Sequence, residues 1–530
     1  MKQKLVIIVV AFALILAPVS FACTEPVEEP EEPEGPQYGG VMRIIVTALP
    51  LMMAYPGMMS PGDHAYVFPA VERLIESAYD VDTDERYFEP FLCESYFIDQ
   101  VAKTFTFHLR DGIKFSDGSD LTSEVVKWNF EMNVEGGWVQ DADKIESIET
   151  PDPLTMIIHF TEYSNQIEFN WGWSVNINSK AAWEAAGTTL EERIDWATDH
   201  VVGTGPFVLK EYQRDVKVVW EKNDDYWQDD RPYLDGLEYI LIPDSVTASA
   251  MLQAGESDMW AQGSSASDWE ELEAKNYTVQ RYWTGMPSVL FPNTVNPESK
   301  FQDKNLREAM EYALDKDVIA EALGLGYYKA LDQIAPEGEW GYVPDLDVRE
   351  YSRNKARQLM EASGYSAENP CEVKLLIQNI PAAVDAGEAI KSYLDDAYFD
   401  VELDLADFGR FFGSYFGFGW DDLIVGFYGM DVNNLATYMS WFSHDPKTNI
   451  ASFERTPEQI EMDKAIVLLA DPTEQEAALE DILSYLHEEA RFCPLWWVPS
   501  TWIAHPYVHT DYFQQGFIRW RLYDAWMGEH

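Results

Sequence analysis

The chain has few positive charges. Its 530 residues include 37 Lys and Arg but 92 Asp and Glu, which gives a formal net charge of −55. A protein of that sign repels phosphate groups, and this argues against binding to nucleic acid or to an anionic membrane surface. The acidic residues are spread along the chain, and two explanations for them stay open: a heavily solvated, salt-adapted surface, or a cleft that suits a cationic solute.

Cysteine is scarce as well, with four in the chain and no C-x-x-C pair. Three of the four, Cys93, Cys371 and Cys493, lie beyond the N-terminal region. At most one disulfide can form among three cysteines, and the sequence does not say which pair would form it.

Motifs of catalysis are absent from the sequence. It contains no G-x-S-x-G elbow, no G-x-x-x-x-G-K-[ST] phosphate loop and no H-E-x-x-H zinc motif. His505 and His509 are four residues apart, but Pro499 and Pro506 argue against a helix that would bring them together, so we expect two surface or cleft-rim histidines. No catalytic residue, metal or cofactor is predicted, and the chain is not expected to be an enzyme. A secreted hydrolase with an unrecognised set of catalytic residues remains an alternative.

One apolar run stands at the N-terminus, and it is too short to span a membrane. Lys2 and Lys4 precede 13 apolar residues from Leu5 to Ala17, whereas a spanning helix needs about 20. The sequence Ser20-Phe21-Ala22-Cys23 then resembles a bacterial lipobox, with Ser20 in place of the usual leucine. We therefore predict a signal peptide over residues 1–22 and a lipid anchor on Cys23; secretion without a lipid, with cleavage nearby, is the alternative.

An acidic segment follows the predicted anchor. Residues 24–37 contain six Glu and four Pro and almost no side chain that a core could bury. Such a composition is typical of an extended, disordered tether, here predicted over residues 23–37.

The remaining chain has enough apolar material for several cores, with 46% apolar and 14% aromatic residues. Alternating segments such as 154–160 and 237–242 predict strands, and a helix is predicted to begin after Ser352 and to end at Gly364. Trp171 and Trp173 are expected to pack on one face of a further strand. The fold class predicted from these patterns is α/β or α+β.

Residues 103–131 carry the strongest local pattern. Phe105, Phe107 and Leu109 alternate with polar residues and predict a strand, and turns follow at Asp111-Gly112 and Asp117-Gly118. Thr122 stands where a helix N-cap belongs. The helix that follows is predicted to bury a stripe formed by Val125, Trp128 and Met132.

This string resembles a family signature that reads T-F-x-L-R-x-G-x-K-F-x-D-G-x-x-L-T-A-x-D-V, from which Ser123 and Val125-Val126 depart. The family is that of the large extracytoplasmic solute-binding proteins of ABC importers, solute-binding family 5, which includes oligopeptide, dipeptide and nickel binders. Further blocks resemble family motifs in the same order: residues 38–44, 202–212 with 223–227, 250–260, 301–323 and 352–365. The resemblance extends from residue 38 to about residue 500.

The resemblance implies a mixed α/β fold with two lobes, a hinge, and an extra inserted domain. It places a discontinuous lobe I at 38–62, 200–288 and 500–530, the inserted domain at 63–199 and the opposing lobe at 289–499. The implied function is a membrane-tethered receptor, a monomer on the outer face of the cytoplasmic membrane, in the periplasm or at the cell surface. It would capture a peptide-like or other small solute between its lobes and deliver it to an ABC permease whose ATPase is a separate subunit. A receptor that signals or a chaperone without a transport role is the alternative.

Two segments are predicted to contact the solute. The first, residues 420–441, has a buried-strand pattern at 423–425 followed by aromatic residues between glycines, and residues 431–434 resemble the end of a cleft motif of peptide-binding members. Its aromatics would either fill part of the core or line the cleft. The second, residues 281–293, resembles the strand that crosses between the lobes. The candidate contacts are Trp420, Asp421, Asp422, Phe427, Tyr428, Met430, Asp431, Asn433, Asn434 and Trp441 from the first segment, and Tyr282, Trp283 and Phe291 from the second.

Met430 stands where the resemblance places the aspartate that holds a peptide's amino terminus, although Asp431 could take that role. A thioether cannot pair with an ammonium group. The sequence therefore favours a solute held by aromatic faces over a peptide held by its amino terminus.

The predicted lipid anchor can be tested by removing the sulfur that would carry it. A Cys23→Ser variant is expected to leave the membrane fraction and appear in the soluble fraction, because the remaining signals are a cleavable segment and an acidic tether. A variant that stays with membranes after a high-salt wash would contradict the assignment.

Overall fold

A computed structural model describes residues 35–54, 57, 66–80, 85–338, 340–427, 435, 438–439, 442, 450–510 and 522–529. The predicted signal peptide, Cys23 and most of the predicted tether lie outside these residues. Within the part of the chain that the structure describes, every helix is too short or too polar to cross a membrane.

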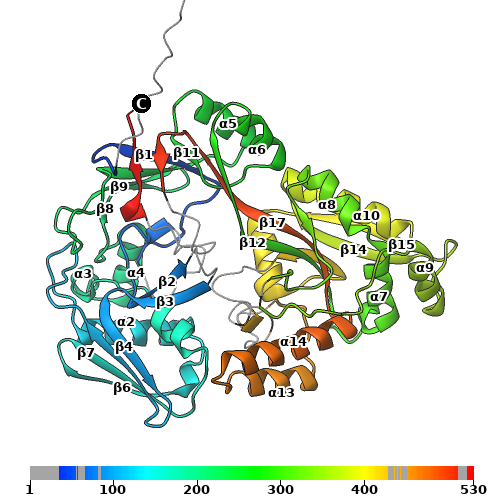
Figure 1. The fold of residues 1–530 in the computed structure, drawn as a ribbon, viewed down its shortest axis with the longest axis horizontal. Coiled ribbons are helices and arrows are strands. Elements are labelled where there is room, and N and C mark those ends of the chain that lie inside the picture. The colour runs from blue at the N-terminus through cyan, green and yellow to red at the C-terminus, as the bar shows by residue number, and fades with distance from the viewer. Residues whose placement is uncertain are drawn as a thin grey trace, which may run out of the picture.

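One mixed sheet of 11 strands runs through the whole molecule (Figure 1). Its strand order is β15-β14-β16-β12-β17-β11-β1-β10-β9-β8, and β13 pairs with β17 beside this path. The strands are β1 (Val41–Val46), β8 (Phe207–Gln213), β9 (Lys217–Lys222), β10 (Gly236–Leu241), β11 (Met259–Trp260), β12 (Thr278–Pro292), β13 (Lys329–Ala330), β14 (Cys371–Gln378), β15 (Phe399–Ala406), β16 (Leu423–Phe427) and β17 (Cys493–Ala504).

The end of this sheet from β8 to β11, together with the helices α5 (Ser245–Gln253) and α6 (Ala266–Glu273), is called lobe I. Its core contains Met42, Trp220, Tyr239 and Trp502, all buried. The C-terminal residues return to this lobe, where β18 (Val508–His509) pairs with β19 (Trp526–Met527) after the short helix η6 (Leu522–Asp524).

A second layer lies beneath lobe I in Figure 1, and we call it the inserted domain. A four-stranded antiparallel sheet has the order β4-β5-β7-β6, and a separate β2-β3 ribbon lies beside it. The elements are β2 (Ile75–Asp80), β3 (Glu85–Pro90), β4 (Cys93–Asp99), β5 (Thr104–Leu109), α2 (Ser123–Gly136), η1 (Ala142–Lys144), β6 (Ile145–Asp152), β7 (Thr155–Phe160), η2 (Glu168–Trp173), α3 (Lys180–Ala185) and α4 (Leu190–Asp199).

The other end of the large sheet, with the helices packed on it, is called the opposing lobe. Two buried clusters fill it, one around Phe291 and Tyr415 and one around Met310 and Leu375. Its helices are η3 (Lys300–Gln302), α7 (Lys304–Ala313), α8 (Lys316–Gly324), α9 (Arg353–Ala362), α10 (Pro381–Asp395), α11 (Phe408–Gly413), η4 (Ser414–Phe418), α13 (Pro457–Ile466) and α14 (Pro472–Glu488). The two-lobed α/β fold expected from the sequence is confirmed.

The strand and the N-cap predicted in residues 103–131 are confirmed, but the predicted buried stripe is wrong. Thr122 accepts a hydrogen bond from the backbone N–H of Val125. The fully buried apolar side chains of α2 are Val126 and Phe130, whereas Trp128 and Met132 are half-buried. The reason is that α2 lies between two cores: Val126 and Phe130 enter the core of the inserted domain, and Trp128 and Met132 pack against that of lobe I.

α3 and α4 also bind the inserted domain to lobe I. Trp183 and Ala197 belong to the buried cluster of lobe I, whereas the cluster of the four-stranded sheet extends from Leu74 to Ile177. The domain limits given above therefore stay a prediction, with residues 180–199 packed against lobe I.

Trp171 and Trp173 pack as expected, but the strand predicted for them is wrong. Both side chains are buried in the inserted domain, and the indole N–H of Trp171 donates to the carbonyl of Gln140 at 3.0 Å. Residues Glu168–Trp173 form a single π-helical turn, a conformation that alternation of apolar residues cannot reveal.

The three cysteines beyond residue 35 are all free and buried. Burial in apolar surroundings raises the pKa of the Cys93 thiol to about 12. These thiols therefore contribute as small apolar side chains.

A buried carboxylate, Glu72, joins the inserted domain to lobe I. It accepts hydrogen bonds from the Thr204 hydroxyl (2.7 Å), the Tyr226 hydroxyl (2.7 Å) and the Trp227 indole N–H (2.9 Å). These donors lie in the two neighbouring motifs at 202–212 and 223–227, which explains why the motifs occur together. The backbone approaches closely here, since a Cβ added at Gly203 would lie 1.9 Å from the carbonyl oxygen of Ala70.

Burial dominates the electrostatics of Glu72 and raises its pKa from the usual 4.5 to about 7, although the three donors act in the opposite direction. Below pH 4.5 the carboxyl holds a proton in both the folded and the unfolded chain. Between pH 4.5 and about 7 only the folded chain holds it, so this contribution to stability is lost as the pH rises through about 7.

We therefore predict that the free energy of unfolding of the wild type, relative to a Glu72→Gln variant, falls between pH 4.5 and pH 8. Each pH unit between 4.5 and about 7 changes it by about 1.4 kcal/mol, so the total is about 3.5 kcal/mol. Urea unfolding at several pH values measures this difference, and Glu298→Gln, at an exposed loop position, serves as the control. Parallel pH profiles for wild type and Glu72→Gln would contradict the prediction.

Candidate functional site

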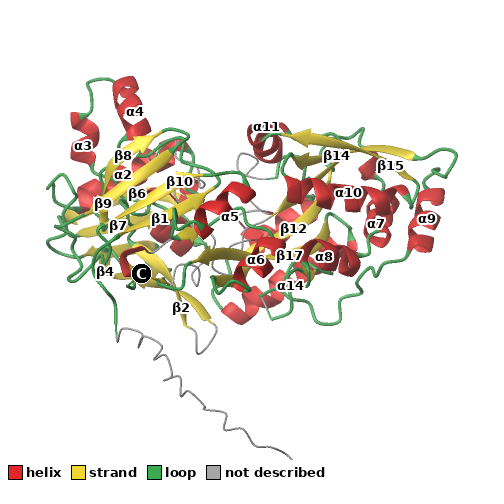
Figure 2. Cartoon of the chain, turned by 90° about the horizontal axis from the view of Figure 1, so that it is seen from above, coloured by secondary structure: helices red, strands yellow, loops and turns green. Residues whose placement is uncertain are grey.

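Two long strands, β12 and β17, connect lobe I with the opposing lobe (Figures 1 and 2). Residues 278–282 of β12 pair with residues 500–504 of β17 beside β11, and residues 286–290 pair with residues 493–498 beside β16. The same antiparallel pair thus belongs to both lobes.

The pairing of β12 and β17 is irregular between the lobes. Tyr282 pairs with Ser500 and Met286 pairs with Val498, so β12 advances four residues while β17 advances two. A bulge of this kind interrupts the ladder and bends the strand. The strand ladder that the two lobes share is interrupted at this point.

The lobes also touch beside the crossing. Trp269 of α6 packs edge-on against Tyr327 of the opposing lobe, with ring centroids 5.7 Å apart, and Arg281 lies 4.4 Å from the centroid of the same Tyr327 ring. Arg281 in turn pairs with Glu273 at 2.7 Å. These contacts join the two lobes on one side of the crossing.

β16 runs towards this crossing. It is antiparallel to β12, with Leu423 opposite Pro292 and Phe427 opposite Ser288. Since residue 288 of β12 is closer to the bulge than residue 292, the chain leaves β16 at the end that faces the crossing. Within the segment predicted to contact solute, Phe427 is therefore at the end of β16 that faces the crossing.

Tyr415 positions the end of β16, and sequence reasoning did not identify it. Its hydroxyl donates to the carbonyl of Phe427 at 2.5 Å, and its ring packs against Phe427 and Phe291. A Cβ on Gly426 would lie 2.5 Å from the Tyr415 ring, so only glycine permits this contact. The glycine and aromatic residues of 413–419, just before Trp420, form the sequence pattern that could have identified Tyr415.

Trp420 lies in the core of the opposing lobe. Its side chain is 6% exposed and stacks on Tyr415 at a centroid distance of 6.3 Å. Asn293 donates to its carbonyl at 2.6 Å, and its own backbone N–H donates to the Ser452 hydroxyl at 3.2 Å. This placement favours a role in packing.

Asp421 and Asp422 lie at the end of β16 away from the crossing. Asp421 pairs with Lys374 at 3.0 Å, and Asp422 accepts from the backbone N–H of Lys374 at 2.9 Å and from Lys300 at 3.3 Å. Both carboxylates thus already have cationic partners. Their predicted contact with a solute has no support in this position.

The three candidates on β12 differ from one another. Tyr282 lies at the bulge, half-buried, with its hydroxyl 3.4 Å from the side-chain oxygen of Gln280. The side chain of Trp283 lies outside what the structure describes. Phe291 is fully buried among Tyr415, Phe442, Phe453 and Phe492, so the prediction that it lines the cleft is wrong: no face of the ring is left for a solute.

Phe427 is the described member of the first segment closest to the crossing. Its side chain is half-buried and packs edge-on against Phe412 at 5.9 Å. The other members lie outside the described residues, so their roles stay predictions: Tyr428, Met430, Asp431, Asn433, Asn434 and Trp441.

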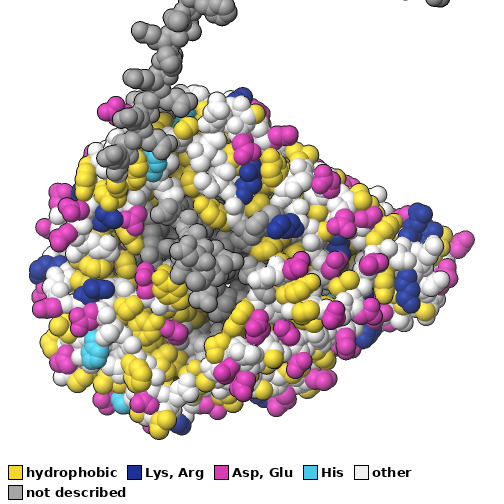
Figure 3. All heavy atoms as spheres, viewed as in Figure 1, with side chains coloured by type: hydrophobic (Ala, Val, Ile, Leu, Met, Phe, Trp, Pro, Cys, Tyr) yellow, Lys and Arg dark blue, Asp and Glu magenta, His cyan; other side chains and the backbone are white. Residues whose placement is uncertain are grey.

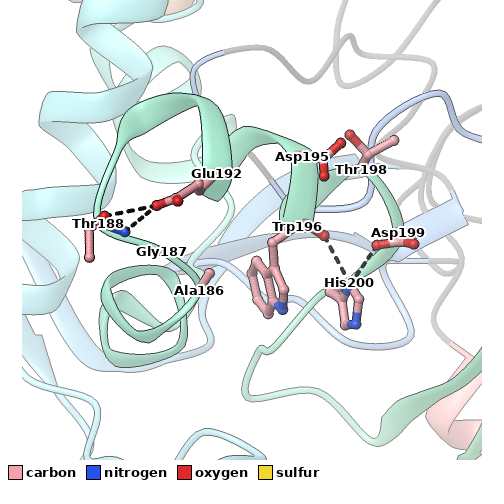
Figure 4. A pocket seen from close by; sticks show the side chains of 9 residues that line it. All are labelled: Ala186, Gly187, Thr188, Glu192, Asp195, Trp196, Thr198, Asp199 and His200. Atoms are coloured by element: carbon pink, nitrogen blue, oxygen red, sulfur yellow. Dashed lines mark hydrogen bonds and ion pairs between the residues drawn. The ribbon is translucent and has the colours of Figure 1, made fainter.

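A pocket of about 710 Å³ lies elsewhere, on the helical hairpin formed by residues 186–200 (Figure 4). Two of its acidic groups have partners within the hairpin: Glu192 accepts from the backbone and hydroxyl of Thr188, and Asp199 contacts the Nδ1 atom of His200 at 2.5 Å. The indole of Trp196 is stacked by the His200 ring. All lining residues come from one element pair, so a molecule bound there would not bridge the lobes.

Over the described residues, no group of three or more His, Cys, Asp and Glu side chains is arranged to hold a metal ion. His505 lies 2.9 Å from the carbonyl of Leu252 and stacks on Tyr507, and His509 stacks on Trp526. The acidic side chains are scattered over both lobes on the face seen in Figure 3. This distribution favours the explanation of a solvated acidic surface.

Known proteins share the fold over nearly the whole chain. The structure superposes on the ABC transporter-associated periplasmic binding protein DppA from Helicobacter pylori, solved in complex with the peptide STSA, with a TM-score of 0.81. The superposition covers 93% of this chain and 99% of that one, at 21% sequence identity.

Sequence relatives match over a shorter part. The dipeptide-binding protein of Escherichia coli strain K12 is 25% identical over 324 residues, which cover 56% of this chain and 58% of the relative. Heme-binding protein A of Haemophilus influenzae is 27% identical over 301 residues, which cover 52% of this chain and 54% of the relative. The matched region thus spans a little over half the length of these relatives.

A family profile covers a larger region. The profile described as bacterial extracellular solute-binding proteins, family 5 Middle, matches residues 88–449. That region contains most of the inserted domain, β12 and its bulge, and most of the opposing lobe including β16. The chain therefore belongs to family 5 of the bacterial extracellular solute-binding proteins.

Proposed function

We propose that this protein is the solute receptor of an ABC importer, that it binds solute where its two lobes meet, and that it delivers the solute to a permease. The observation that carries the proposal is the crossing of β12 and β17, with its bulge, in a chain of family 5. Two lobes joined by a bent strand pair can rotate about it, and a solute that contacts both lobes favours the closed arrangement.

Membrane attachment and transport complete the proposal. A lipid on Cys23 would hold the receptor on the outer face of the cytoplasmic membrane, and residues 24–37 would let it reach a permease. The sequence contains no phosphate-binding loop, so the ATPase would be a separate subunit.

The solute is proposed to be held mainly by aromatic faces. Phe427 ends β16 beside the crossing, Tyr428 follows it directly, and Tyr282 lies at the bulge of the opposite strand. Aromatic faces suit sugar rings, planar groups and apolar side chains. The relatives themselves are named for different solutes, a dipeptide and haem, and a third holds the peptide STSA, so family membership alone does not select one class.

We predict that the radius of gyration from solution X-ray scattering falls when the solute that co-purifies with the protein is returned to solute-free protein. The physical reason is rotation at the crossing, which brings the lobes together. Native mass spectrometry identifies the solute beforehand. Scattering curves that superpose with and without saturating solute would contradict a closure mechanism.

We also predict that Phe427→Ala and Tyr428→Ala each weaken solute binding by about tenfold, equivalent to about 1.4 kcal/mol, because each removes an aromatic face. Phe418→Ala is the matched control: Phe418 lies in the same lobe but is 90% exposed on the short helix η4. Isothermal calorimetry with a peptide library and an oligosaccharide set measures the effect.

One result would overturn the aromatic proposal. It is tight binding of free peptides that is abolished by acetylation of their amino termini and unaffected by both substitutions. In that case Asp431 would be the group to examine as the ammonium ligand.

A further inference from the structure

The inserted domain touches the opposing lobe directly, through one asparagine. The backbone N–H of Asn165 donates to the carbonyl of Val467 at 2.8 Å. Its side-chain amide donates to the carbonyls of Ile466 at 2.8 Å and Leu469 at 3.0 Å. About 300 residues of chain separate the two sides of this contact, which we call the Asn165 clasp.

The acceptors of the clasp are groups that a helix end leaves available. Ile466 is the last residue of α13 and Val467 is its C-cap, so both carbonyls lie at the end of the helical hydrogen-bond ladder. The carbonyl of Ile466 also accepts from the backbone N–H of Leu469 at 3.1 Å. The carbonyl of Leu469 lies in the turn before α14 and also accepts from the side chain of Gln475 at 2.9 Å. The turn between α13 and α14 thus presents three carbonyls to the inserted domain.

The amide of Asn165 is oriented before it meets these carbonyls. Its oxygen accepts from the side-chain amide of Gln166 at 2.8 Å, which leaves its NH₂ group directed at Ile466 and Leu469. Gln166 is itself buried, and its backbone N–H donates to the Ser164 hydroxyl at 3.2 Å.

The loop that carries Asn165 is held by a buried polar network. Asp141 accepts from the Ser164 hydroxyl at 3.0 Å, from the Asn170 side chain at 3.0 Å and from Lys144 at 2.9 Å. Ser164 and Asn170 are both buried. Because the loop is already ordered, little conformational entropy is lost when the clasp forms.

The clasp lies away from the crossing of β12 and β17. In Figure 1, α13 and α14 form the lower edge of the opposing lobe, next to the inserted domain, whereas the strands cross nearer the centre. The inserted domain is fixed to lobe I by α2 and by Glu72. Rotation at the crossing that opens the lobes therefore carries Asn165 away from α13.

We propose that Asn165 is a positioning residue for closure: its clasp forms in the closed arrangement, breaks on opening, and sets the open–closed equilibrium without touching the solute. The proposal rests on the proposed function, since it concerns the same closure. A contact made in only one of two states changes the free-energy difference between them by the full free energy of the contact. It thereby changes the apparent affinity for any solute that binds the closed state.

The test compares three variants by solution X-ray scattering, each as purified and again after solute has been removed by unfolding and refolding. Asn165→Ala removes the two side-chain hydrogen bonds and keeps the backbone one. Asn165→Asp places a carboxylate against the carbonyl oxygens of Ile466 and Leu469. Asn354→Asp makes the same charge change at an exposed position of α9, far along the sequence from the clasp.

The expected result is a larger radius of gyration for Asn165→Asp than for wild type in at least one of the two forms, a smaller increase for Asn165→Ala, and none for Asn354→Asp. Circular dichroism and the midpoint of thermal unfolding check that each variant is folded; Asn165→Ala decides the matter if Asn165→Asp does not fold. Scattering curves of both Asn165 variants that superpose on wild type in both forms would overturn the proposal.

Failure of the clasp and failure of the proposed function give different results. If wild type retains no solute and does not become more compact with any, the receptor function is contradicted, yet the variants still report on the clasp in solute-free protein. If wild type compacts on binding and the Asn165 variants compact identically, closure stands and the clasp does not.

Discussion

Hydrogen bonding between β12 and β17 is the interaction on which the rest of the structure depends. Because this strand pair belongs to both lobes, one continuous sheet joins lobe I to the opposing lobe. The larger of the two irregularities in its ladder, between Tyr282 and Met286, lies between the lobes. Everything proposed for the solute site follows from the fact that β16 ends beside that irregularity.

A second constraint is the attachment of the inserted domain to lobe I. α2 contributes to two cores at once, and Glu72 gathers donors from two motifs of lobe I. The inserted domain is thus packed on lobe I. A contact between Asn165 of the inserted domain and α13 therefore also links lobe I to the opposing lobe.

The sequence predicted the fold class, the first helix cap at Thr122 and the family, because these depend on short patterns and on a motif order that this chain keeps. It could not predict which face of α2 is buried, since periodicity cannot reveal that a helix lies between two cores. The π-helical turn at Trp171 and Trp173 was not predicted either, because alternation of apolar residues cannot reveal it. At the candidate site, the strand at Leu423 was predictable. The burial of Phe291 and the lysine partners of Asp421 and Asp422 were not, because they depend on residues distant in sequence.

The scattered acidic surface has a consequence for the energetics of closure. When two strongly anionic lobes approach, their mutual repulsion rises, and dissolved salt screens it over about 8 Å at physiological ionic strength. Dilute buffer lengthens the reach of that repulsion and favours the open form. If the lobes close on a solute as proposed, closure should thus become easier as the salt concentration increases, the opposite of what is expected when binding depends on ion pairs.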